Sequence, residues 1–421
     1  MFFIEDGIDI IIWGCGYRGK WFTEKYKDRY NICYYVDNKV RQDEIVYMRD
    51  GHAVYNPVFL QKEDLDRYMI IIAIDKWEEV ILHLNISSIK IFENCIPWEC
   101  VEYKSFNPRL LHYLSSKEEK ERAIRKFARG RRICVPFGFC HLLAYKRLLM
   151  KSDEFSEKYF FIDFLPLHSE DDMLYEMLQE EAIYNTCDIF LLGIIRPQNL
   201  RFQLHMSVTE NIKKWARSDC RVISITSATF KGYFPQHTDH RNNGCDKNGI
   251  PIVQYFTWGD KNINKMFKMG LSTDEIIRKI LDTDYYEAER CRKYFENEFS
   301  ILEKSEEKCD VKIADYLRTI YDKTIAYYSW THPTPIILIE IARRIALLLG
   351  IEDDFMRFKD EDFLQMNRNE EIVYPSVLKA LGLQDEKYLY RKVRPGRMLF
   401  MGKRLSTEEY ISKYIEYVLE G

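Results

Sequence analysis

The chain has 421 residues, which is too long for one ordinary hydrophobic core and suits two domains. Hydrophobic residues make up 46% of the chain and charged residues 30%, and this balance argues against disorder over most of its length. The 62 Lys and Arg residues against 66 Asp and Glu leave a net charge of -4, so the overall positive charge typical of nucleic-acid-binding proteins is absent.

The N-terminal residues and the cysteines predict a cytoplasmic protein with reduced thiols. The chain begins MFFIEDGIDIIIWGCG, which is acidic before a short apolar run, the opposite of a secretory signal. No stretch approaches about 18 uninterrupted apolar residues, so we expect no membrane span. The 11 cysteines are scattered and contain no CxxC pair, so neither disulfides nor zinc are expected. The 14% aromatic share predicts a Tyr-rich core, while carbohydrate stacking and a homo-oligomer interface stay open.

Strands alternate with helices in the first 110 residues. We expect strands at 8–13, 32–36, 69–74 and 89–92, helices at 20–26 and 78–84, and a turn-rich connection at 51–57. This alternation predicts a parallel sheet with right-handed crossovers.

A charged segment at 111–131 separates this unit from the next. Ser115-Ser116 followed by Glu118 and Glu119 resembles a helix start, so we predict a solvated linker helix. An anion-binding patch at Arg129, Arg131 and Arg132 is the alternative.

A second alternating series and then a helical part form the predicted domain at 132–421. The expected strands are 133–137, 159–164, 188–192 and 221–225, and the expected helices are 141–150, 172–181, 208–216, 262–269, 273–281, 285–303, 313–327, 335–349 and 407–419. The predicted fold class is therefore α/β, with a half-Rossmann parallel sheet at 1–110 and a second α/β domain with a helical C-terminal part.

A GxGxxG motif follows the first predicted strand. The motif residues that point to a nucleotide or phosphate loop are Gly14, Gly16, Tyr17 and Gly19, with Asp37 at the end of the next strand as a ribose acceptor. The arrangement, with "VDN" at 36–38, resembles small Rossmann-like domains at the N-terminus of sugar acyltransferases, which implies a nucleotide-sugar. Only half of a dinucleotide site is present, so three interpretations stay open: a nucleotide-sugar or other phosphate site, a turn kept for packing, and redox use of NAD, the least favoured.

Cys140 and His332 are the candidate reactive side chains. The segment CVPFGFCH at 134–141 passes from strand to helix, and the helix dipole and free N–H groups near Cys140 favour a thiolate and could hold an oxyanion. Far downstream, WTHPTP places His332 just before a helix that Thr334 can cap and Pro335 can begin. A packing or surface histidine is the alternative for His332.

The other histidines give weaker signals. His237 and His240 form an HxxH pattern in a Gly/Asn/Asp-rich loop, but no helix and no third ligand accompany them, so we predict no metal site. His168 and His205 are interpreted as ordinary loop or helix residues.

Taken in order, these motifs resemble the WcbI family of capsular-polysaccharide enzymes. The family pattern runs from Gly-Asn-Cys-Gln after a strand, through Gly-Tyr-x-Pro, to Asn-His-Pro before a long helix. The matching segments here are GFCH at 138–141, GYFP at 232–235 and THP at 331–333, supported by 302–351 and YPSV at 374–377. The resemblance covers roughly residues 132 to 385.

The resemblance implies an SGNH-hydrolase-like α/β fold, coenzyme A binding and an acetyltransferase role in capsule assembly. It points to Cys140 and His332 as catalytic residues and to an oxyanion or cofactor-binding group of Gly138, Phe139, His141 and Thr331. Phe139 and His141 depart from the Asn and Gln of the family pattern, and the loss of the Asn amide weakens an oxyanion hole. Ser329 stands where SGNH enzymes place an Asp, so the carboxylate partner of His332 is not identified.

The expected reaction is acyl transfer from acetyl-CoA to a sugar hydroxyl. His332 would act as general base while N–H groups at 138–140 stabilise the oxyanion, or Cys140 would first take the acyl group. Two alternatives stay open: a glycan O-deacetylase, and a non-catalytic component of a glycan-assembly complex that binds a nucleotide-sugar or CoA. Glycosyl transfer is not favoured, because no DxD-like metal pair follows a strand in a suitable place.

Overall fold

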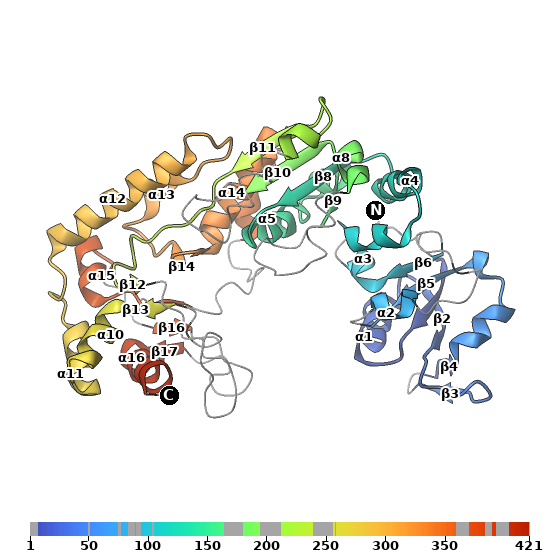
Figure 1. Ribbon diagram of the computed structural model, residues 1–421, viewed down its shortest axis with the longest axis horizontal. Coiled ribbons are helices and arrows are strands. Elements are labelled where there is room, and N and C mark those ends of the chain that lie inside the picture. Colours follow the sequence, from blue (N-terminus) through green and yellow to red (C-terminus); the bar gives the residue numbers. More distant parts are fainter. Residues whose placement is uncertain are drawn as a thin grey trace.

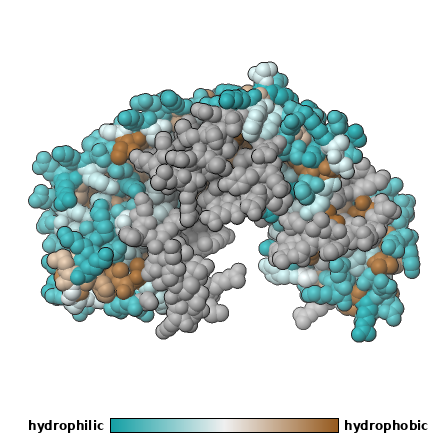
Figure 2. All heavy atoms as spheres, viewed as in Figure 1, coloured by the Kyte–Doolittle hydropathy of each residue, from teal (hydrophilic) through white to brown (hydrophobic). Residues whose placement is uncertain are grey.

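The computed structural model describes residues 7–420 apart from 49–50, 75–76, 83–88, 90–93, 103–104, 164–179, 194–211, 239–255, 257, 359–369, 384–389 and 393–403. Among the described residues, none of the helices combines the length and the apolar character that a membrane crossing requires. On the face shown in Figure 2 the described residues are mainly hydrophilic, and hydrophobic residues form small separate groups.

The N-terminal part is a six-stranded sheet. Its strands are β1 (Asp9–Trp13), β2 (Asn31–Val36), β3 (Val46–Tyr47), β4 (Ala53–Tyr55), β5 (Tyr68–Ile72) and β6 (Cys95–Pro97), in the order β3-β4-β2-β1-β5-β6. All neighbours are parallel except β3 and β4. The strand order reverses between β1 and β5, the place where doubly wound sheets bind ligands. The predicted parallel sheet is confirmed.

Two details of this sheet differ from the prediction. The connection expected at 51–57 contains β4, a three-residue strand between turn residues that is too short to show a pattern. Most of the strand expected at 89–92 lies outside the described residues, and the strand that pairs with β5 is β6. Helices α1 (Tyr17–Tyr26), α2 (Trp77–Leu82) and α3 (Trp98–Glu102) complete this part.

The predicted linker helix is α4 (Lys117–Ala128), but it is not solvated all round. The helix starts where the sequence predicts, and Ser116 and Glu119 form a capping box there. One face is buried, and salt bridges to Glu180 and Glu181 link α4 to α8 (Glu181–Thr186). The anion-patch alternative is not supported at Arg131, because its guanidinium donates to the carbonyls of residues 127, 128 and 156.

The second sheet has five parallel strands. They are β7 (Ser105–Phe106), β8 (Arg132–Phe137), β9 (Tyr159–Ile162), β10 (Ile189–Gly193) and β11 (Arg221–Ile225), in the order β11-β10-β8-β9-β7. Ile225 also forms a parallel bridge with Val311 beyond the β11 edge. The order reverses between β8 and β10, so the crevice outside their carboxyl ends is the expected ligand position. Figure 1 shows this sheet between the six-stranded sheet and the C-terminal helices.

Strand β7 belongs to the second sheet although it precedes the predicted domain boundary at residue 110. Ser105 pairs with Phe161 of β9. The buried Lys146 ammonium lies 2.5 Å from Asp163 Oδ1 and donates to Ser105 Oγ at 2.8 Å. Burial lowers the pKa of Lys146, and the Asp163 carboxylate opposes that change. A division into units at 1–110 and 132–421 therefore stays a proposal.

The second sheet is covered on both faces. Along β8, Cys134 joins the hydrophobic cluster that contains α5 (His141–Leu149) and α14 (Pro335–Leu348). Ile133, Val135 and Phe137 join the other cluster, which contains α4, α8 and the six-stranded sheet. Successive side chains of a strand point to opposite faces, so this alternation gives a helix–sheet–helix sandwich. The predicted α/β class is confirmed.

The C-terminal part is mainly helical. Helix α6 (Asp153–Lys158) does not belong to it and lies between α5 and β9 of the second sheet. The elements of the C-terminal part are α14 and, in chain order, β12 (His237–Thr238), β13 (Gly259–Asp260), α10 (Lys261–Lys268), α11 (Thr273–Leu281), α12 (Ala288–Glu306), α13 (Ala314–Ile320), β14 (Tyr327–Ser329), β15 (His332–Pro333), α15 (Pro375–Leu381), β16 (Tyr390–Lys392), β17 (Arg404–Ser406) and α16 (Thr407–Tyr414), which continues as a π-helical turn (Ile415–Leu419). Most predicted helices agree within three residues at their ends, but parts of those at 172–181 and 208–216 lie outside the described residues.

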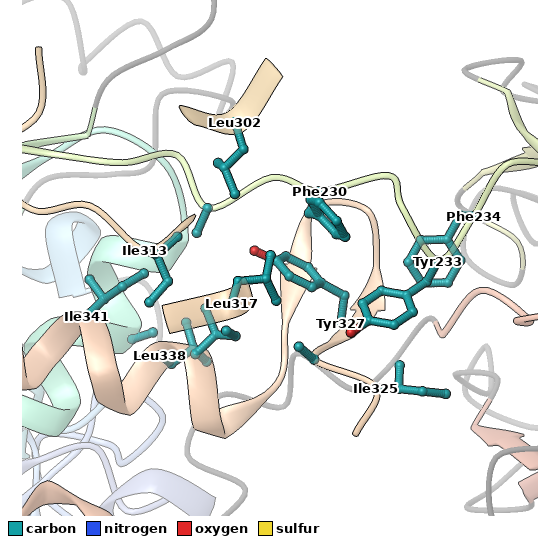
Figure 3. Close-up of a cluster of buried hydrophobic side chains, with 14 of the residues drawn as sticks. Phe230, Tyr233, Phe234, Leu302, Ile313, Leu317, Ile325, Tyr327, Leu338 and Ile341 are labelled. Carbon is teal, nitrogen blue, oxygen red and sulfur yellow. The ribbon is translucent and has the colours of Figure 1, made fainter. Parts of the chain in front are cut away.

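The helix predicted at 313–327 is wrong in its C-terminal half. It ends at Ile320, and Tyr327 begins β14. The buried Tyr233 hydroxyl donates to the carbonyls of Tyr321 and Thr324, which satisfies backbone groups just after the helix end. Figure 3 shows the rings of Tyr233, Phe230 and Tyr327 in one buried cluster. The GYFP turn at 232–235 therefore contributes to packing of the hydrophobic core.

Candidate functional site

The carboxyl end of β8 is shaped by Gly138. Its φ is +154°, and a Cβ there would lie 2.8 Å from Leu142 Cδ1 and 3.1 Å from the backbone of Gly193. Gly193 ends β10, so the two central strands bring their backbones together at this edge. A side chain at 138 would push the loop away, which is why glycine suits this position.

Cys140 and His141 follow directly at the start of α5. The backbone N–H groups of both residues lower the pKa of the Cys140 thiol. Burial has the larger effect and raises the pKa of Cys140 to about 11. The expected thiolate is therefore wrong for this structure: desolvation of the sulfur outweighs the helix N-terminus.

His332 lies on a tight hairpin between β14 and β15. Ser329 pairs with His332, and Pro335 occupies the first turn of α14, as predicted. Thr334 is the residue before the helix, but its hydroxyl donates to Ala326 O at 3.0 Å and makes no capping bond. The hydroxyl thus closes the hairpin, and the histidine is held between a strand pair and a helix start.

The structure brings these two loops together across 190 residues. His141 Nε2 lies 2.5 Å from Thr331 O, and because a carbonyl only accepts, Nε2 of His141 carries the proton. The rings of His141 and His332 have centroids 6.4 Å apart at 82°. The predicted group of residues 138–141 and 331–332 therefore lies at one place, at the carboxyl edge where the strand order reverses.

A buried cluster next to the 331–332 turn was not predicted from the sequence. His237 Nδ1 lies 2.8 Å from Glu371 Oε2, and Glu371 Oε1 accepts the Trp330 N–H at 3.1 Å. The rings of His237, Trp258 and Trp330 have centroids 5.1–5.3 Å apart. Glu371 thereby braces the backbone two residues before His332. The WTHP motif contained Trp330, but no local signal marked Glu371.

No group of three or more potential metal ligands occurs within the described part of the chain. His237 of the HxxH pattern contacts Glu371, while His240, His168 and His205 lie outside the described residues. The ten described cysteines are all free thiols.

The N-terminal glycine loop has internal partners. Asp37 Oδ2 accepts the Cys15 N–H at 3.0 Å and the Cys15 thiol at 3.2 Å, and Oδ1 accepts the Lys39 N–H at 2.9 Å. Burial raises the pKa of Asp37, but these hydrogen bonds outweigh it and the pKa is lower than usual. The carboxylate expected to bind a ribose therefore holds the loop itself.

Gly19 explains why the loop needs glycine. A Cβ at Gly19 would lie 2.0 Å from the Gly14 carbonyl oxygen, so helix α1 and the loop pack without space for a side chain. Gly16 precedes the helix and Tyr17, its first residue, is 76% exposed. These contacts favour the packing interpretation, and the nucleotide-sugar interpretation stays a prediction.

A charged cavity of about 750 Å³ lies elsewhere, against α12, α13 and the C-terminal end of α14. Its Arg318 and Arg344 are paired with carboxylates, namely Glu296, Glu303, Asp315 and Glu340. His332 lies at the opposite end of α14, so this cavity is separate from the meeting of the two loops.

Comparison with known proteins gives the family. The family model for the polysaccharide biosynthesis enzyme WcbI matches residues 133–354, more than half of the chain. The chain belongs to the WcbI family. This confirms the family resemblance seen in the sequence, and the matched region contains Gly138, Cys140, His141 and His332.

A solved WcbI structure shares the fold of this WcbI-family chain. It has 15% sequence identity and a TM-score of 0.55, and the match covers 69% of this chain and 91% of that one. That protein is described as a novel polysaccharide biosynthesis enzyme, in native form without a disulfide bond between coenzyme A and one of its cysteines. No curated protein sequence matches the chain.

Proposed function

We propose that this WcbI-family protein transfers an acyl group from acyl-CoA to a sugar hydroxyl during polysaccharide biosynthesis. The observation that carries the proposal is the contact between the 138–141 loop and the 331–332 turn. A base, a thiol and a run of N–H groups then lie at one sheet edge, the combination that acyl transfer requires.

His332 is the proposed general base. It lies on a hairpin that is fixed by Thr334 on one side and by Glu371 through Trp330 on the other. An imidazole held in this way can take the proton of a sugar hydroxyl as that oxygen attacks the acyl carbon. His141, bonded to the carbonyl of Thr331, acts as a positioning residue for the same turn.

The N–H groups at 138–141 are the proposed oxyanion donors. Those of Cys140 and His141 lower the pKa of the Cys140 thiol, which means that they stabilise negative charge there, and they would stabilise an oxyanion beside the sulfur in the same way. This arrangement compensates for the Asn that Phe139 replaces, because backbone donors need no side chain.

The high pKa of Cys140 favours direct transfer over a covalent intermediate. Burial keeps the sulfur protonated near neutral pH, and a thiol is a much weaker nucleophile than a thiolate. The donor supplies the activated acyl group as a thioester. The half-buried position of Cys140 suits contact with the thioester end of the acyl-CoA donor. The coenzyme A named for the solved relative is consistent with such a donor. A cytoplasmic location, where acyl-CoA is available, is part of the proposal.

The test compares His332→Ala with His112→Ala, an exposed histidine outside the proposed site. Transfer of acetyl from radiolabelled acetyl-CoA to a panel of sugar acceptors should fall about 10²–10⁴-fold in His332→Ala and stay unchanged in the control. Full activity in His332→Ala would remove the proposed base. Release of acetate from an acetylated glycan without CoA would indicate the O-deacetylase instead. Absence of turnover despite sugar or CoA binding would indicate the non-catalytic component of a glycan-assembly complex.

A further inference from the structure

Helix α10 carries a row of lysines along a groove. Lys261, Lys265 and Lys268 recur at helical spacing, and together with Asn264 they line a groove of about 360 Å³. Thr238 of β12 and the exposed Met269 complete the described lining. The row extends over about 10 Å, since a helix rises about 1.5 Å per residue.

Among the residues that the structure describes, the three ammonium groups have no carboxylate partner. No described carboxylate lies within ion-pair distance of Lys261, Lys265 or Lys268, although all three line the same groove. The chain as a whole is acidic, with a net charge of -4. Three positive charges around one hollow, with no carboxylate partner in the described part of the chain, form a local positive field that favours an anion.

The groove is connected to the proposed site by short contacts. The backbone N–H of Lys261 donates to the carbonyl of Gln236 at 3.0 Å. His237, which follows Gln236 in the chain, packs its ring against that of Trp330. Trp330 is two residues from His332. Strand β12, which contains His237 and Thr238, therefore has the catalytic turn at one side and the lysine groove at the other. Figure 1 shows α10, β12, β13 and β14 in the same part of the molecule.

We propose that the α10 groove binds the acidic groups of the acceptor, a carbohydrate that bears carboxylate or phosphate. The sugar unit at His332 would receive the acyl group while acidic groups further along the glycan pair with the lysines. The identification of the ligand as the acceptor rests on the proposed function. The negative charge of the ligand is inferred from the lysine groove alone. Three exposed lysines suit an extended anion with repeated charges. Each lysine contributes only modestly to the binding free energy, and the row is longer than a single carboxylate or phosphate group.

Binding of tetragalacturonic acid, measured by titration calorimetry without any acyl-CoA, tests the proposal. The Lys261→Ala/Lys265→Ala/Lys268→Ala protein should bind it about tenfold more weakly than the unchanged protein, since each exposed charge pair contributes a few-fold. A control with alanine at the exposed Lys126, Lys214 and Lys304 should bind normally. Raising the salt concentration from 50 mM to 300 mM should weaken binding to the unchanged protein and remove most of the difference. Neutral maltotetraose should show no dependence on the three lysines.

Equal binding of the acidic tetramer by the triple variant and the control would overturn the proposal. So would a loss that affects CoA but not the acidic tetramer, because the groove would then serve the donor. Neither result bears on His332, whose role is measured separately by acetyl transfer. If the unchanged protein binds the acidic tetramer through the three lysines but transfers no acetyl group, the anion-binding groove stands and the acyltransferase proposal is rejected.

Discussion

The protonation of Cys140 gives the sharpest test of how the site works. With a pKa of about 11, about one thiol in 3,000 is ionised at pH 7.5, against about one in 30 at the ordinary value of 9.0. Alkylation by iodoacetamide follows the thiolate, so the rate at Cys140 should be about 100-fold below that of an ordinary thiol of equal access. It should also rise about tenfold for each pH unit up to pH 10.

Peptide mass spectrometry after timed alkylation between pH 6.5 and 10 measures each cysteine separately. Cys220 is the internal reference, because its hydrogen bond with the Cys187 thiol lowers its pKa and it is also half-buried. The shape of the pH profile carries the test, since limited access lowers every rate equally. A Cys140 profile that levels off by pH 8 would refute the reasoning: the N–H groups would then outweigh burial, and the covalent route would become the better mechanism.

Three further predictions concern stability, each measured by urea unfolding. Gly138→Ala should lower the free energy of unfolding by about 1–3 kcal/mol, because φ is +154° and Gly193 leaves no space for a Cβ. Asp260 has a pKa raised to about 6 by burial, so protonation favours the folded state. Its contribution is complete below about pH 4 and is lost as the pH rises through 6, at a cost of about 3 kcal/mol that Asp260→Asn should not show. Glu371→Ala removes the acceptor of the Trp330 N–H and the partner of His237, and should cost about 2–4 kcal/mol, whereas Glu371→Gln should cost less. Unchanged stability in Glu371→Ala would show that the cluster does not brace the turn.

The sequence predicted the elements that have a strong and regular pattern. The apolar strands β1, β5, β8 and β10 and the helices α5, α11 and α14 follow from unbroken or periodic hydrophobic residues. Strands β4 and β7 have three and two residues, and a pattern of that length carries no information. The end of α13 depends on Tyr233, which lies about 90 residues earlier and could not be recognised from the local sequence.

The candidate site shows the same division. The turn at 138–141 and the WTHPTP segment have local signatures, so each was found, and the family resemblance related them to each other. The Glu371 brace needs four separate segments, at 237, 258, 330 and 371, to meet in space. The charge state of Cys140 was predicted in the wrong direction, because a helix N-terminus is visible in a sequence and the desolvation of a sulfur is not.

The two-residue strand β7 has a practical consequence for anyone who divides this protein into parts. A shortened protein that starts at residue 111 would leave β9 as an open edge and would remove the Ser105 hydroxyl from a buried ammonium group. Such a fragment should be prone to aggregation even if every residue of the WcbI match is retained. A fragment that starts before residue 105 would keep β7 paired with β9. A start just before β7 is therefore better both for expressing the fragment and for exchanging it with the same part of a related protein.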